Sequence, residues 1–228
     1  MPKLSMPPAL NDELIHEITE LCFYESPRAE GNILVTFGTN LGVTAAAHKT
    51  MAELKKGLTK ILALTGGMPS AFKAFSEIRP GLSEAQAIYD LIFSDPATCS
   101  LAGQTEYLFL ERRSLNTKEN VANLHDRLRV VDDDRVVCVC HAYAAQRVFL
   151  TMKSFFPDIE VMVSPYEIEK SLPRGRMVSM TRQGWFRSDL SRGLVWGEVL
   201  RLEAYGAMGE FSIEPVRARL ERIRMLAG

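Results

Sequence analysis

The sequence contains no hydrophobic run approaching the roughly 18 residues that a membrane-spanning helix requires. Glu13, Glu17 and Glu20 interrupt the N-terminal segment in which the apolar part of a signal peptide would have to lie. Charge of one sign is not in excess either, because 27 basic and 28 acidic residues give a formal net charge of −1. A general nucleic-acid or membrane-surface protein would be strongly basic. We therefore expect a cytoplasmic protein with no nucleic-acid partner and no membrane partner.

Several familiar site signatures are also missing. There is no G-x-G-x-x-G string, no P-loop and no nucleophile elbow, which argues against a standard NAD site and against the common hydrolase triad. No group of His, Asp or Glu has metal-ligand spacing, so we predict no metal site. Cys138 and Cys140 lack a second close pair, and in a reducing compartment we expect them to be buried structural thiols.

The chain does contain a regular alternation of strand and helix signals. An amphipathic helix is expected over residues 9–24, capped by Asn11 or Asp12. The expected strands are residues 33–37, 60–65, 106–110, 135–140 and 159–163. The helices expected between them end near Gly57, run from Ser83 to about Phe93 and from Asn116 to about Leu128, and cover residues 142–155. The remainder is expected to be loop plus two helices, near residues 189–205 and 214–226.

This alternation predicts an α/β fold with a doubly wound parallel sheet. Short, almost continuously apolar strands are typical of a parallel sheet covered by helices on both faces. The loops that follow such strands meet at one edge of the sheet, and ligands bind there at a switch in strand order. The strand ends are therefore where functional residues are expected.

Small and polar residues follow each of the first four expected strands. They are Gly38, Thr39 and Asn40; Gly66 and Gly67; Glu111, Ser114, Asn116, Thr117, Glu119 and Asn120; and His141, with Arg147 farther along the next helix. Glycines let a ligand approach the backbone, and helix N-termini offer free N–H groups to an anion. The same glycines could instead serve only to make turns.

The roles of the individual polar residues remain open. His141 could act as an acid or base, or be a packed residue. Glu111 and Glu119 could bind a ribose or act as acid and base, although Glu119 also suits the dipole of a helix N-terminus. Asn116 or Thr117 could cap that helix, and Asn120 is expected to point its amide toward the ligand.

The C-terminal region is rich in arginine and contains both tryptophans. The arginines are Arg174, Arg176, Arg182, Arg187, Arg192 and Arg201, and the tryptophans are Trp185 and Trp196. Arginine binds phosphate and carboxylate in a bidentate manner, and tryptophan can stack on rings. The alternative is a solvated surface over a core tryptophan.

The string Glu111-x-x-Ser114-x-Asn116-Thr117-x-Glu119-Asn120 resembles a motif of the YdcF/SanA/ElyC-like family, whose function is largely unassigned. Gly38 after a strand, Thr65-Gly66-Gly67 and Ser83-Glu84-Ala85 match the family too, over about residues 31–165. Gln146-Arg147 and Gly197-Glu198-x-x-Arg201-Leu202, followed by Tyr205-Gly206, are similar to its cytoplasmic YdcF branch. A histidine that many SanA-like members carry is replaced here by Ala144.

The resemblance implies a Rossmann-like core over residues 31–165, preceded by an N-terminal helix and linker (1–30) and followed by a helical C-terminal appendage (166–228) that packs on the core. It also implies S-adenosylmethionine as a cofactor and adds Glu84 to the candidate ligand-binding residues.

Three functions are left open. One is binding of a small anionic or nucleotide-like ligand, such as S-adenosylmethionine. The alternative is a hydrolase or transferase for a small phosphorylated or carboxylated metabolite. In that case His141 and a glutamate would be acid and base, and Arg147 and the C-terminal arginines would hold the anion. A regulatory or interaction protein that keeps the fold without catalysis is a third possibility.

Overall fold

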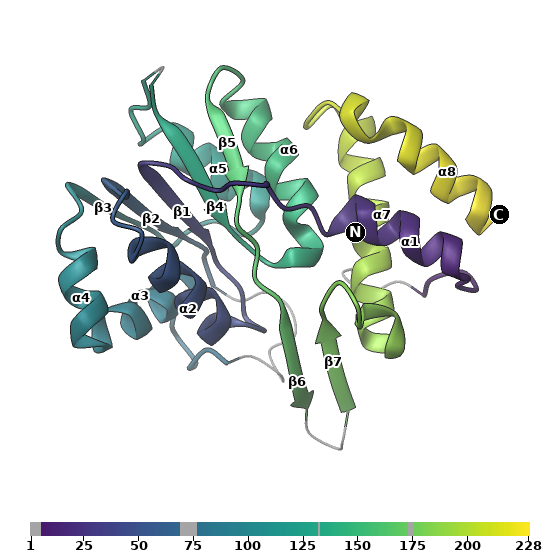
Figure 1. Cartoon of the computed structure of the whole chain (residues 1–228), viewed down its shortest axis with the longest axis horizontal. Coiled ribbons are helices and arrows are strands. Elements are labelled where there is room, and N and C mark those ends of the chain that lie inside the picture. Colours follow the sequence, from purple (N-terminus) through teal and green to yellow (C-terminus); the bar gives the residue numbers. More distant parts are fainter. Residues whose placement is uncertain (1–5, 69–76, 132, 173–175) are drawn as a thin grey trace.

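The structure is a computed structural model, and it describes residues 6–68, 77–131, 133–172 and 176–228. Five parallel strands form one sheet in the order β3-β2-β1-β4-β5. The strands are β1 (Ile33–Phe37), β2 (Ile61–Thr65), β3 (Tyr107–Glu111), β4 (Arg135–Val139) and β5 (Glu160–Val163). From β1 the chain winds outward through β2 to β3, and it then returns to add β4 and β5 on the other side of β1 (Figure 1). The predicted α/β, Rossmann-like fold is thereby confirmed, and the switch in strand order lies between β1 and β4.

Alternate strand residues face two separate hydrophobic layers, because successive side chains of a strand point to opposite faces of a sheet. Leu34 belongs to one layer, and Ile33 and Val35 belong to the other. Helices α2 (Val43–Leu54) and α3 (Glu84–Ser94) cover the first face, with α4 (Pro96–Ala102) beside α3. Helices α5 (Thr117–His125) and α6 (Ala145–Phe155) cover the second face. The 3₁₀ turn η2 (Ala142–Ala144) leads into α6.

The two ends of the chain pack together at one side of the sheet. Helix α1 (Asp12–Cys22) contacts both α7 (Asp189–Ala207) and α8 (Arg217–Ala227) (Figure 1). The short turns η4 (Trp185–Arg187) and η5 (Glu214–Val216) precede these two C-terminal helices. Trp185 is fully buried, and its indole N–H donates to the Thr19 hydroxyl of α1 at 2.8 Å. The N-terminal helix is therefore part of the same helical layer as the C-terminal appendage.

The sequence-based expectation for residues 166–188 needs correction. A loop was predicted there, but β6 (Ile168–Leu172) and β7 (Arg176–Met180) form an antiparallel hairpin in which Lys170 pairs with Val178. The mixed polar and apolar sequence of β6 gives little strand signal. Its strand is defined by pairing with β7, which a local sequence pattern does not reveal. Helix α4 was likewise not predicted, because Pro96 occupies its first position and obscures a short helix.

Local capping signals were more reliable. Ser83 caps α3 by accepting a hydrogen bond from the Gln86 N–H at 3.1 Å, and Asn11 caps α1 in the same way. Asn116 caps α5, and it is one of the two residues, Asn116 and Thr117, that were predicted as possible caps. Within the described ranges, no helix is both long and apolar enough to cross a membrane.

Candidate ligand-binding site

A pocket of about 220 Å³ lies at the carboxyl ends of the parallel strands. The loops after β1, β2, β3 and β4 all contribute to its wall, as the parallel topology predicts. The predicted residues that line it are Gly38, Thr39, Asn40, Gly66, Gly67, Glu84, Ser114, Asn116, Thr117, Asn120, His141 and Arg147. Two predicted residues, Glu111 and Glu119, do not line it.

The glycines of the first two loops are needed because the loops pack against each other. Gly66 has a φ of +146°, and a Cβ atom there would lie 2.8 Å from the Gly38 Cα. A Cβ on Gly38 would lie 2.6 Å from the Glu84 Cβ, and one on Gly67 would lie 2.1 Å from the Ser114 carbonyl oxygen. No real side chain fits these distances. Close packing of the loops therefore explains these glycines, although the residues also line the pocket.

Glu111 holds the loop between β3 and α5 in place. Its Oε1 accepts hydrogen bonds from the N–H groups of Arg113 and Ser114 at 2.6 and 3.0 Å and from the Asn123 amide at 3.1 Å. Its Oε2 accepts from the hydroxyls of Ser114 and Thr65 at 2.6 and 3.0 Å. Burial alone would raise the pKa of Glu111, but these hydrogen bonds outweigh burial and lower it. Because its acceptors are committed to the loop and it does not line the pocket, the geometry does not support the ribose-binding or catalytic role expected for Glu111.

Glu119 is committed in a similar way. Asn116 Oδ1 accepts from the Glu119 N–H at 2.9 Å, and the Glu119 carboxylate accepts from the Leu115 N–H at 2.8 Å and from the Asn116 amide at 2.7 Å. This reciprocal arrangement resembles a capping box. Glu119 thus supports the start of α5 outside the pocket, as the capping alternative predicts, and the geometry does not support the ribose role expected for it.

Asn120 lines the pocket but is not free of other contacts. It is 7% exposed, and its Oδ1 lies within hydrogen-bonding distance of the hydroxyls of Thr65 and Ser114. Both hydroxyls also contact Glu111. Asn120 therefore belongs to a buried polar cluster that joins β2, β3 and α5. Replacing Asn120 should reduce the stability of the fold as well as the binding of any ligand.

His141 follows β4 and is 9% exposed. Its Nε2 lies 2.7 Å from the Thr39 hydroxyl, and its ring packs against Tyr143 and Tyr166. Its Nδ1 is buried and has no hydrogen-bond partner among the residues that the structure describes. Burial lowers the pKa of His141 to about 3, since the charged form loses its hydration. The imidazole is neutral at physiological pH, which does not favour a role as general acid.

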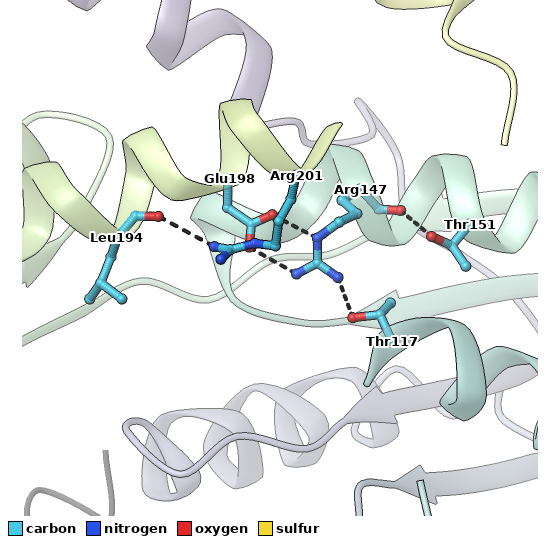
Figure 2. A network of polar contacts seen from close by, with 6 residues as sticks. All are labelled: Thr117, Arg147, Thr151, Leu194, Glu198 and Arg201. Carbon is cyan, nitrogen blue, oxygen red and sulfur yellow. Dashed lines mark hydrogen bonds and ion pairs between the residues drawn. The ribbon is translucent and has the colours of Figure 1, made fainter. Parts of the chain in front are cut away.

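One wall of the pocket is formed by a buried group of three charged side chains. Arg147 of α6 donates to Glu198 of α7 through Nε at 2.6 Å and Nη2 at 2.8 Å, and its Nη1 contacts the Thr117 hydroxyl (Figure 2). Arg201 donates to the same carboxylate through Nε at 3.1 Å and Nη2 at 2.9 Å. The group connects helices α5, α6 and α7 at the pocket.

The electrostatics of this group follow from two cations sharing one anion. Burial would raise the pKa of Glu198, but Arg147 and Arg201 outweigh burial and lower it to about 2. The pKa of Arg147 is raised by Glu198 in spite of its burial. Glu198 is therefore charged at neutral pH, and because two guanidinium groups share this one carboxylate, one positive charge is in excess.

Several pocket residues were not assigned to the site from the sequence. Leu194, Glu198 and Tyr205 line the pocket together with Arg201, and Tyr143 lines it from the segment after β4. The four α7 residues are spaced i, i+4, i+7 and i+11, which is the spacing of one helix face. That spacing was readable in the sequence, but nothing local indicated that this face meets the strand ends.

Among the described residues, the other C-terminal arginines and the two tryptophans do not line the pocket. Arg182 donates to the Phe23 carbonyl and pairs with Glu20 of α1, and Trp185 is a core residue. The pocket wall described here does not include Arg187, Arg192 or Trp196. Arg174 lies outside the described residues, as does the side chain of Arg176.

No group of three or more potential metal ligands occurs in the described part of the chain. No protein-family model matches this chain, and no curated protein matches it. The resemblance to the YdcF/SanA/ElyC-like family therefore rests on the short sequence motifs given above, chiefly that of residues 111–120, and stays a prediction.

Proposed function

We propose that this protein binds a small anionic, nucleotide-like ligand in the pocket at the switch between β1 and β4. The observation that carries the proposal is the buried Arg147–Glu198–Arg201 group on the pocket wall. Its excess positive charge is held in a partly enclosed site, where electrostatic attraction to an anion is stronger than in water. The Thr39 and Asn40 side chains on the wall add polar groups that can orient a bound molecule.

S-adenosylmethionine is the first ligand to test, because the family resemblance implies it. Its carboxylate would suit the arginine end of the pocket, and aromatic and apolar residues such as Phe37, Tyr143 and Tyr205 offer surface for its adenine. Of the three predicted glutamates, Glu84 is the one that lines the pocket, so it is the candidate contact for ribose hydroxyls.

The proposal concerns binding and does not include turnover. The alternative of a hydrolase or transferase relied on His141 and a glutamate as acid and base. The low pKa of His141 does not suit a general acid, and Glu111 does not line the pocket, so we propose binding rather than this alternative.

Isothermal titration calorimetry of the full chain with S-adenosylmethionine, S-adenosylhomocysteine, AMP and ATP tests the proposal, with free methionine as a control. We expect at least one adenine ligand to bind with a Kd below about 100 μM, and to stabilise the protein by about 2.7 kcal/mol at one hundred times Kd. Native mass spectrometry of freshly purified protein tests for a ligand that co-purifies. If none of the four adenine ligands binds, the proposal that the ligand is nucleotide-like is wrong.

A further inference from the structure

The pocket wall carries a guanidinium group whose donors are not all used. Arg201 is 9% exposed, and its Nε and Nη2 are occupied by Glu198 and by the Leu194 carbonyl at 3.5 Å. Its Nη1 is buried and donates to no group in the described ranges. Buried polar groups in folded proteins nearly always have a partner, so each exception calls for a physical reason.

The charge at this place is also unbalanced. Arg147 and Arg201 share one carboxylate, so their combined charge exceeds that of Glu198 by one. Glu84, the other carboxylate on the pocket wall, packs against Gly38 and Gly66. If the three side chains served only to hold helices together, there would be no reason to bury a surplus cation with an unmet donor.

We propose that Arg147 and Arg201 form an oxyanion subsite, and that the ligand group bound there is a phosphate or a carboxylate. This inference rests on the proposed function in that it uses the same pocket. A planar guanidinium group matches both oxyanions through paired N–H donors. Glu198 is then a positioning residue that orients both arginines and keeps the net charge at one.

Two further features fit an oxyanion at this position. Helix α6 begins at Ala145, and its N-cap residue Ala144 lies on the pocket wall. The Ala145 N–H donates to the Ala142 carbonyl, but no side chain offsets the positive end of the helix dipole. Thr117, whose hydroxyl contacts Arg147, lies at the start of α5. Solvent does not reach Arg201 Nη1 in this structure, so a ligand oxygen can bind it only if the atoms around it move.

The subsite can be tested without any nucleotide. Sodium phosphate or sodium acetate replaces sodium chloride at constant ionic strength and pH 7.5, and the melting temperature of the full chain is followed. We expect a saturable rise with phosphate, acetate or both, and an apparent Kd in the millimolar range. Arg201→Gln should weaken this binding at least tenfold. Arg217→Gln, which removes an exposed arginine from its pair with Glu214, should respond as the wild type does.

A second variant keeps the test decisive if Arg201→Gln does not fold. Arg201→Lys retains the positive charge and an ion pair with Glu198 but removes Nη1, so we expect oxyanion binding at least threefold weaker than in the wild type. Equal responses of the wild type and the folded Arg201 variant would overturn the subsite. So would the absence of any response of the wild type to both ions.

Matched ligand pairs identify the source of the oxyanion and separate this inference from the proposed function. AMP against adenosine tests a phosphate, and S-adenosylmethionine against its decarboxylated form tests a carboxylate. Adenine ligands that bind the wild type and the Arg201 variant equally well would support the proposed function and overturn the subsite. Phosphate binding that depends on Arg201, without binding of any adenine ligand, would support the subsite and contradict the proposal that the ligand is nucleotide-like.

Discussion

Arg147 and Glu198 are 51 positions apart in the sequence and form a bidentate ion pair, with nitrogen–oxygen distances of 2.6 and 2.8 Å. The pair fastens α7, in the C-terminal part of the chain, to α6 on the sheet (Figure 2). Because its atoms also form the pocket wall, the ion pair couples the stability of the appendage to the geometry of the candidate site.

Glu198→Leu should be strongly destabilising. The substitution leaves two buried guanidinium groups without their shared carboxylate, and breaking a buried ion pair in this way costs about 3–5 kcal/mol. Urea denaturation followed by circular dichroism at pH 7.5 measures the loss. Glu214→Leu removes an exposed carboxylate with a similar arginine partner and should leave the unfolding midpoint unchanged. Comparable midpoints for the two variants would show that the buried group does not stabilise the fold.

His141 should make the protein less stable as the pH falls below 6.5. Its pKa in the folded protein is lowered to about 3, so between pH 6.5 and 3 the unfolded chain binds a proton on this residue that the folded chain does not. The stabilisation is therefore complete above the unfolded pKa and is lost on acidification, with a limiting slope of about 1.4 kcal/mol per pH unit.

His141→Gln isolates this contribution, because glutamine can keep the contact with Thr39 but cannot be protonated. We expect the unfolding free energy of the variant to fall less steeply than that of the wild type between pH 6.0 and 5.0. All carboxylates titrate in both proteins and cancel in the comparison. Parallel pH curves would mean that His141 is protonated normally in the folded state.

The sequence was sufficient for features that depend on neighbours along the chain. The apolar run of β1 between glycines, and the caps Ser83 and Asn116, are each determined within a few residues. The parallel topology then placed His141 and Gly38 at the same edge of the sheet. Such reasoning also identified most of the loop residues that line the pocket.

The remainder of the site depends on contacts between distant segments. The position of α7 against the strand ends is set by packing and by the Arg147–Glu198 pair, and no local pattern encodes that placement. For the same reason, the roles expected for Glu111 and Glu119 could not be tested from the sequence. Whether a carboxylate faces a pocket or its own loop depends on which N–H and O–H groups surround it in the folded chain.

Gly66→Ala should destabilise the protein more than Gly57→Ala. Both glycines have a positive φ, +146° and +72°, but a Cβ on Gly57 would meet no atom within 4 Å, whereas one on Gly66 would lie 2.8 Å from the Gly38 Cα. The strained backbone alone costs about 1 kcal/mol, and forcing extra atoms into packed loops adds about 1–3 kcal/mol. Urea denaturation of both variants measures the difference. Similar losses would mean that the loops can move apart.

Glu111→Gln should reduce stability by about 1–3 kcal/mol, because one oxygen that accepts hydrogen bonds is replaced by an NH₂ group that faces donors. Glu119→Gln is the matched control, since its carboxylate lies in an exposed capping arrangement where an amide can still accept one hydrogen bond. The loss for Glu111→Gln should also shrink as the pH falls below about 4.5, because the lowered pKa of Glu111 stabilises the fold only while the carboxylate is charged. Urea denaturation at pH 7.5 and pH 4.0 measures both effects. If Glu111→Gln instead kept full stability but lost binding of an adenine ligand, Glu111 would be a ligand contact, and its assignment to the loop would be wrong.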